Sequence, residues 1–277
     1  MMKTIFTGII LILISGVNML SAQRLEKVWQ TTGDLKTPES VIYDEERDVI
    51  YVANINGDPS AKDGNGFISI LKTDGSVKNL EWVKNLNAPK GMAIYKGKLY
   101  VADIDQLVEI DIEKGAIIKK FNAPDAVFLN DVTATMNGKI FVSDTRTAKI
   151  HLLNENKFTV WMEGEPLQNP NGLMAENGKL FVGDNHIYEV DIQTKKTTLL
   201  IKDAGGVDGL EKNNSGDFVF SNWPGRIFIH KNGETIKLLD TTEQELKTAD
   251  IDYALKLDLL LVPTFFDNKI VAYKIVF

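Results

Sequence analysis

The sequence predicts an all-β protein, a single six-bladed β-propeller with four-stranded blades. Three observations support this prediction. A short apolar strand pattern recurs six times at intervals of 38 to 49 residues, and further β-type segments follow each copy. No stretch of 12 residues beyond the N-terminal apolar segment has helical periodicity. A period near 40 residues that contains only strands is typical of a propeller blade.

The recurring strand serves as the marker of each repeat. A short strand and a turn precede it, and two more strands follow it, so that one repeat supplies one blade. The marker strands span residues 50–54, 99–103, 140–144, 180–184, 218–222 and 260–264.

The sixth repeat is one strand short, because the chain ends at Phe277 soon after the segment 269–274. The segment 25–30, Leu-Glu-Lys-Val-Trp-Gln, can supply the missing strand. We expect it to complete the last blade, which closes the ring and removes an exposed sheet edge. The alternative interpretation is that residues 23–32 form a loose leader.

The first 22 residues differ in character from the rest of the chain. Lys3 gives a short positive start, an apolar stretch covers 5–20, and small residues precede Gln23. These features predict a signal peptide at 1–22, followed by one propeller domain at 23–277. The protein is therefore expected to be exported, periplasmic or secreted, with no membrane span after cleavage. An uncleaved amphipathic anchor is the less favoured alternative.

Composition excludes several classes of function. The formal net charge is −7, from 38 acidic and 31 basic residues with no basic block, so nucleic acid is not an expected partner. The chain has no cysteine, which excludes disulfides, a lipid-bearing cysteine and thiolate metal sites. Stability must come from core burial and ring closure. A monomer is the default expectation.

A set of polar residues occupies one position in the repeats, 11 to 13 residues before the centre of each marker strand. The first strand of a propeller blade lines the central channel, so these positions should meet at one mouth of that channel. This position also explains Asn171, a residue type that strands disfavour. The six residues, called the ring residues below, are Glu39, Lys90, Asn130, Asn171, Asp208 and Asp250.

The ring is rich in oxygen ligands. Glu, Asn and Asp side chains suit a hard divalent cation such as calcium, which takes six to eight oxygens. The three histidines lie outside this position, which disfavours a zinc site of the histidine type. The alternative is that the ring only lines a water-filled channel. Lys90 has three open roles: contact for an anionic substrate, internal counter-ion in place of a metal, or solvent-facing residue.

The motifs Asn130-Asp131, Pro170-Asn171-Gly172 and Val207-Asp208-Gly209-Leu210 resemble those of the senescence marker protein/gluconolactonase/regucalcin family of six-bladed propellers. The resemblance covers the mature chain, with one motif per blade. It implies a lactonase-type activity and a single bound divalent cation, calcium foremost, with manganese, magnesium and zinc as alternatives. It also implies Asp208 as the acceptor of the proton from the attacking water. The implied metal ligands are Glu39, Asn130, Asn171 and Asp208.

The chain departs from the family pattern at three places. Glu39-Ser40-Val41 replaces Glu-Gly-Pro, the segment 128–130 lacks a basic substrate contact, and Lys90 stands within the ring. Candidate substrate contacts are Lys90, Trp223 and Asp250, although a channel-lining role is favoured for Asp250 and a blade-packing role for Trp223.

Two other features are interpreted as structural. Asp103, Asp144 and Asp184 end marker strands too regularly to define one active site, and short side chains there bond to local backbone. The segment 56–65 is expected to be a flexible surface loop beside the site.

The leading functional hypothesis is an exported, divalent-metal-dependent hydrolase of lactonase type. Its partner would be a small lactone, ester or sugar derivative held at the channel mouth. One alternative is a non-catalytic propeller that binds a sugar, peptide or protein; another is a lyase or isomerase that uses the same metal. The substitution Asp208→Asn separates the first two, because it should abolish turnover in a hydrolase but only alter affinity in a binder.

Overall fold

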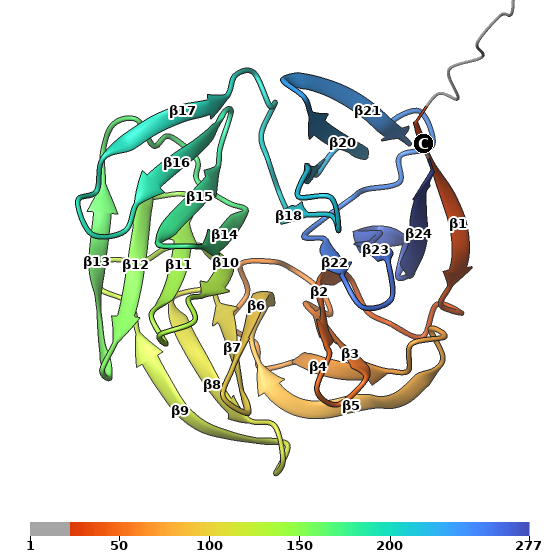
Figure 1. Cartoon of the computed structure of the whole chain (residues 1–277). Helices are drawn as coiled ribbons and strands as arrows, with labels where there is room; N and C mark the ends of the chain where they lie inside the picture. Colours follow the sequence, from red (N-terminus) through yellow and green to blue (C-terminus); the bar gives the residue numbers. More distant parts are fainter. Residues whose placement is uncertain (1–22, 277) are drawn as a thin grey trace, which may run out of the picture.

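The computed structural model describes residues 23–276, in which six four-stranded antiparallel sheets surround a central channel (Figure 1). The predicted six-bladed propeller is confirmed. The predicted signal peptide lies outside the described residues. Within residues 23–276 no helix is long and apolar enough to cross a membrane.

The first three blades follow the chain in order, and the first strand of each is the innermost (Figure 1). Blade 1 contains β2 (Pro38–Asp44), β3 (Val49–Asn54), β4 (Gly66–Leu71) and β5 (Val77–Leu86). Blade 2 contains β6 (Pro89–Tyr95), β7 (Lys98–Asp103), β8 (Gln106–Asp111) and β9 (Ala116–Asn122). Blade 3 contains β10 (Leu129–Ala134), β11 (Ile140–Asp144), β12 (Lys149–Asn154) and β13 (Lys157–Glu163).

The last three blades repeat this arrangement, with one exception at the ring closure. Blade 4 contains β14 (Leu173–Glu176), β15 (Lys179–Gly183), β16 (Ile187–Asp191) and β17 (Thr197–Ile201). Blade 5 contains β18 (Leu210–Lys212), β19 (Phe218–Asn222), β20 (Arg226–Lys231) and β21 (Glu234–Asp240). Blade 6 contains β22 (Asp252–Ala254), β23 (Leu259–Pro263), β24 (Ile270–Val276) and, as its outer strand, β1 (Arg24–Gln30), with the 3₁₀ turn η1 (Phe265–Asp267) between β23 and β24.

The two ends of the described chain close the ring. Strand β1 pairs antiparallel with β24, in a register that sets Arg24 opposite Val276. A second link joins blades 1 and 6 at the channel, where the backbone N–H of Asp250 donates to the carbonyl of Glu39 at 3.0 Å. The predicted closure is therefore confirmed, and the loose-leader alternative is wrong.

Apolar clusters between neighbouring blades form the core. Between blades 1 and 2, for example, Tyr51, Ile68, Leu99 and Val108 pack into one cluster of buried side chains. Every residue of β3 and of β11 is buried, which explains why the marker strands appear in the sequence as short, nearly continuous apolar runs. Burial of these faces removes apolar surface from water and holds the blades together without disulfides.

The acidic residues at the ends of three marker strands fix the segments that lead into the channel. Each carboxylate accepts a hydrogen bond from the backbone N–H of the residue two positions before a ring residue. This bond fixes the position of the backbone just before the inner strand. The structural role predicted for these residues is confirmed. The bonds run from Ala88 N to Asp103 Oδ1 (2.8 Å), from Phe128 N to Asp144 Oδ1 (3.1 Å) and from Asn169 N to Asp184 Oδ2 (2.9 Å).

Glycine follows three ring residues, Lys90, Asn171 and Asp208, because the inner strands of neighbouring blades nearly touch there. A Cβ atom on Gly172 would lie 2.6 Å from the carbonyl oxygen of Asp208, and one on Gly209 would lie 2.3 Å from the backbone nitrogen of Ile251. Only glycine permits so close an approach. The Asn-Gly and Asp-Gly pairs of the sequence thus combine a ring side chain with tight spacing between blades.

Candidate functional site

Five of the six ring residues line one pocket of about 410 Å³ at the channel mouth, called the mouth pocket below. They come from five different blades, as the register of the repeats predicts. Trp223 also lines this pocket, whereas Asp250 does not. The remaining lining residues are apolar and come from loops: Ile55, Pro59, Phe128, Phe265 and Phe266.

The polar side of the mouth pocket contains two carboxyl and two carboxamide groups. Glu39 and Asp208 are 6% and 5% exposed. Asn171 Nδ2 donates to Asp208 Oδ1 at 3.0 Å, and Asn130 Nδ2 donates to Thr145 Oγ1 at 3.1 Å. Among residues 23–276, the buried atoms Glu39 Oε2 and Asn171 Oδ1 have no hydrogen-bond partner. Buried polar atoms are nearly always satisfied, so two orphaned oxygens in one pocket suggest a missing ligand.

The donor set fits a hard divalent cation. Both asparagines use an amide N–H on a protein partner, which orients their amide groups, and oxygen ligands of this kind suit calcium or magnesium. The part of the chain that the structure describes has no cluster of three or more His, Cys, Asp or Glu residues suited to a metal. A cation at the mouth would therefore depend on the carboxamide oxygens of Asn130 and Asn171 as well as on the two carboxylates.

Lys90 is buried inside the ring, at 1% exposure, so the solvent-facing interpretation is wrong. Its Nζ donates to the carbonyls of Pro59 and Ala88, each at 3.0 Å, and lies 4.4 Å from the centre of the Phe128 ring. Burial lowers the pKa of Lys90 to about 8, although the negative charge of Glu39 opposes this shift. The ammonium thus acts on Glu39 through space, because no ion pair joins them in the described structure.

The two carboxyl groups of the mouth pocket have raised pKa values. Burial raises the pKa of Asp208 to about 7, and the hydrogen bond from Asn171 opposes this rise. Burial also raises the pKa of Glu39 well above its usual value; the charges of Asp208 and Asp250 add to this, and Lys90 offsets part of it. A bound cation would favour the ionised forms and would therefore compete with protons for these groups.

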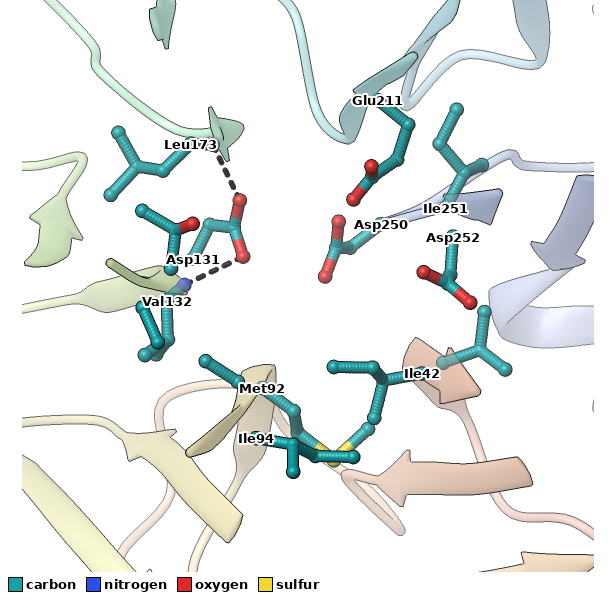
Figure 2. Close-up of a pocket in the computed structure, with 14 residues that line it drawn as sticks. Ile42, Met92, Ile94, Asp131, Val132, Leu173, Glu211, Asp250, Ile251 and Asp252 are labelled. Carbon is teal, nitrogen blue, oxygen red and sulfur yellow. Dashed lines mark hydrogen bonds between the residues drawn. The ribbon is translucent and has the colours of Figure 1, made fainter. Parts of the chain in front are cut away.

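Later residues of the same inner strands line a second cavity of about 190 Å³, called the inner cavity below. Figure 2 shows the carboxyl groups of Asp131, Glu211 and Asp250 pointing toward one another across it. Asp250 Oδ2 accepts a hydrogen bond from Ser40 Oγ at 2.6 Å. This residue therefore lines the inner cavity and joins blades 6 and 1, although its charge still acts on Glu39 of the mouth pocket.

Sequence reasoning missed three carboxyl groups of the inner cavity: Asp131, Glu211 and Asp252. Burial raises the pKa of all three, and that of Asp252 to about 7. Asp131 Oδ2 accepts the N–H of Leu173 at 2.5 Å, and Asp252 Oδ2 accepts the N–H of Tyr43 at 3.0 Å. An available signal was the presence of acidic residues within inner strands, where strand propensity disfavours them.

The loop between β3 and β4 lies beside the mouth pocket, as expected, but three side-chain contacts tether it, which disagrees with the flexibility expected of it. Besides the bond from Lys90 to Pro59, Arg146 Nη2 donates to Ser60 Oγ at 3.2 Å. Lys62 Nζ lies 2.5 Å from Asp105 Oδ2. Sequence reasoning identified Trp223 but missed Arg146 and the phenylalanines of the pocket, because they come from connecting loops that do not follow the repeat.

Comparisons with known proteins identify the fold. No family model matches the chain, and no curated protein matches it. Among solved structures, a catalytically inactive virginiamycin B lyase from Staphylococcus aureus, with quinupristin, has a TM-score of 0.63 at 13% identity and covers 92% of this chain and 100% of its own. A streptogramin B lyase has a TM-score of 0.67 at 12% identity, over 92% of this chain and 98% of its own. A protein of unknown function from Bacteroides thetaiotaomicron has a TM-score of 0.67 at 10% identity, over 92% of this chain and 76% of its own.

These likenesses show a six-bladed propeller and no more, because the identities are low. Propellers of this kind serve both as enzymes and as binding proteins. Any finer statement about this chain has to be argued from its own pocket.

Proposed function

We propose that the protein is a divalent-metal-dependent hydrolase of lactonase type that acts on a small lactone or ester in the mouth pocket. One observation carries the proposal. Side chains from four blades place two carboxyl and two carboxamide groups in one pocket, and two of their buried oxygens have no hydrogen-bond partner among residues 23–276. The likeness of the ring motifs to the gluconolactonase family supports the same activity. The cation would be calcium foremost, with manganese, magnesium and zinc as alternatives.

Glu39, Asn130, Asn171 and Asp208 would hold this cation. When bound, it would supply Lewis-acid polarisation of the substrate carbonyl and would lower the pKa of a water. The protein's own contribution is to hold four oxygen-bearing side chains in fixed orientations. Two kinds of hydrogen bond provide that rigidity. Asp144 and Asp184 hold the backbone just before the inner strands, and the side-chain amides of Asn130 and Asn171 donate to protein partners.

Asp208 is the proposed general base. Burial raises its pKa to about 7 in the metal-free pocket, and a bound cation would keep this carboxylate ionised and able to accept a proton. Asn171 donates to its Oδ1, which leaves Oδ2 to accept the proton of the attacking water. Water then adds across the acyl–oxygen bond: its oxygen bonds to the carbonyl carbon, the ring oxygen leaves, and the proton held by Asp208 completes the hydroxyl group of the product.

Lys90 has a supporting electrostatic role. Its ammonium faces the same pocket and keeps its charge below its pKa of about 8. A positive charge near the carbonyl stabilises the oxygen that becomes negative in the transition state. The two backbone carbonyls that accept from Nζ keep the ammonium in place.

The test begins with metal binding. Protein treated with chelator is unfolded thermally with and without calcium, manganese, magnesium or zinc. A cation at about 100 times its dissociation constant stabilises by roughly 2.7 kcal/mol, which raises the melting temperature by about 5–10 °C for a protein of this size. The rise should vanish in Glu39→Gln and persist in Glu211→Gln, a matched change in the inner cavity.

A panel of lactones and esters then tests turnover. We expect hydrolysis that stops with chelator and returns with the cation identified by unfolding. If no cation stabilises the protein and nothing in the panel is hydrolysed, the hydrolase proposal is wrong. A non-catalytic propeller that binds its ligand at the mouth would then be the better description.

A further inference from the structure

The mouth pocket has a rigid aromatic wall. Trp223 and Phe266 remain 40% and 63% exposed, and their rings meet edge to face at 6.2 Å between centres. Phe265, which is buried, packs against both, at 5.8 Å from Trp223 and 4.7 Å from Phe266. Exposed aromatic side chains gathered at a pocket are typical of a surface that binds an apolar group.

Strain in the backbone supports this interpretation. Phe265 has a φ of +52°, a left-handed conformation that bulky residues rarely adopt. The 3₁₀ turn that contains it is held from outside, because Asn268 Oδ1 accepts the backbone N–H of Thr37 at 2.7 Å. Strained residues that the surrounding structure holds in place cluster at ligand sites. The turn thus presents Phe266 at the pocket in a fixed position.

An exposed guanidinium, that of Arg146, borders the same pocket, because it contacts the lining residue Phe128 and the residue that follows the lining residue Pro59. The guanidinium of Arg146 stacks over Phe128 at 4.2 Å from the ring centre, and one of its N–H groups donates to Ser60. Arg146 is exposed, and within residues 23–276 it forms no ion pair with a carboxylate. A guanidinium fixed by stacking presents its remaining donors in the planar geometry that carboxylates and phosphates match.

We propose that the mouth pocket selects a small amphiphilic anion: a lactone or ester whose aromatic or other apolar ring rests on Trp223 and Phe266 and whose anionic group pairs with Arg146. The inference rests on the proposed function in treating the bound molecule as the substrate. It narrows the substrate class, because a neutral sugar lactone would leave both the aromatic wall and the guanidinium without a partner.

The depth of the charges determines the orientation of the ligand. Glu39 and Asp208 are buried at the channel, whereas Arg146 is exposed at the rim. An anionic group therefore stays at the rim, away from the carboxylates, and the carbonyl of the same molecule can extend toward Asp208.

Calorimetric titration of the whole protein, with and without calcium, tests the inference. The probes are 2-naphthaleneacetate, its neutral amide, 2-naphthyl phosphate and gluconate. We expect the acetate to bind at least tenfold more tightly than the amide, and gluconate, which lacks an apolar ring, to bind far more weakly. The phosphate arm decides whether the anionic group is a carboxylate or a phosphate ester.

Variants locate the two contributions. Arg146→Gln should weaken the acetate about tenfold and change the amide less than twofold, whereas Trp223→Leu should weaken both to a similar degree. Arg24→Gln, on outer strand β1, is the matched control and should change neither. Equal binding of acetate and amide by the unmodified protein, or an Arg146→Gln variant that binds the acetate normally, would overturn the inference.

The two proposals fail separately. Selective binding of the acetate without hydrolysis of any lactone or ester would disprove the hydrolase and leave the anion pocket intact. Metal-dependent hydrolysis without selective binding of the acetate would support the hydrolase and disprove the anion pocket.

Discussion

The mouth pocket and the inner cavity are formed by the same inner strands, yet their chemistry differs. The mouth pocket combines two carboxyl groups with two carboxamides, a lysine and an aromatic wall. The inner cavity gathers four carboxyl groups among Ile, Val, Met and Leu side chains, with no cation among its lining residues (Figure 2). Carboxyl groups in both places have raised pKa values because they are buried.

The difference lies in how the oxygens are satisfied. In the inner cavity, backbone N–H groups and a serine donate to Asp131, Asp250 and Asp252, so the protein itself satisfies these carboxyl groups. At the mouth, Glu39 Oε2 and Asn171 Oδ1 have no partner within residues 23–276. Carboxyl groups that the protein satisfies favour a structural role, whereas two unpartnered oxygens in one pocket favour a site that a ligand completes.

The largest expected effect is a loss of turnover that occurs when the mouth pocket is altered but not when the inner cavity is altered. Asp208→Asn should lower kcat/KM for a hydrolysed lactone by about 10²- to 10⁴-fold, because a general base contributes about that much. Asp252→Asn, the matched change in the inner cavity, should alter it less than threefold. Steady-state kinetics on folded variants measure both. Equal losses in the two variants would end the functional distinction between the regions.

A substitution at the boundary should damage both regions together. A Cβ atom on Gly209 would meet the nitrogen of Ile251 and, at 2.9 Å, Oδ1 of Asp250. Gly209→Ala should therefore destabilise the protein by about 1–3 kcal/mol, the usual cost of overpacking. Denaturant unfolding measures this change. A variant as stable as the unmodified protein would mean that the inner strands can separate without cost.

The inner carboxyl groups predict an unusual pH dependence of stability. The pKa of Asp252 is raised to about 7 in the folded protein, so the folded state binds its proton more tightly than the unfolded state does. This contribution is complete below the ordinary pKa of an aspartate and is lost as pH rises through about 7. The metal-free protein should therefore melt several degrees lower at pH 8 than at pH 5.

Asp252→Asn should flatten this dependence, and Glu243→Gln, at an exposed position, should leave it unchanged. Calorimetric melting curves across this range provide the comparison. A melting temperature that rises steadily between pH 5 and pH 8 would contradict the prediction that Asp252 keeps its proton in the folded protein.

The smallest expected effect concerns Lys90. Its ammonium repels a cation in the same pocket, so Lys90→Met should tighten calcium binding about threefold to tenfold. Lys62→Met, which removes an ammonium paired with Asp105 on the adjacent loop, is the control. Calorimetric titration measures both. Weaker binding in Lys90→Met would show instead that this lysine supports the cation site, through the loop that it anchors at Pro59.

The repeat made the architecture and the ring predictable from sequence. Because the spacing is regular, Glu39, Lys90, Asn130, Asn171 and Asp208 could be placed at one mouth without a structure, and the segment 25–30 could be placed in the last blade. Asp250 satisfied the same spacing but lies in the inner cavity, because its side chain bonds to Ser40 across the ring closure. Register along a strand does not determine toward which end of a channel a side chain points.

Residues outside the repeat could not be predicted in this way. Phe128 and Phe266 reach the mouth pocket from loops, and Arg146 stacks on Phe128 from beside it. The positions of such residues depend on tertiary contacts, for example the bond between Arg146 and Ser60. Loop sequences vary, whereas the blade strands repeat. The loop residues that determine ligand specificity are therefore the hardest part of the pocket to predict from sequence.

The pairing of β1 with β24 has a consequence for how the molecule is assembled. Strand β1 precedes its partner β24 by more than 200 residues, so it has no sheet partner until β24 has been synthesised. The entropic cost of closing so long a loop grows only slowly with its length, but contacts between distant segments slow folding. We therefore expect blade 6 to form last, and a nascent chain truncated before Ile270 to remain open to proteases along the unpaired edges of its first and last strands.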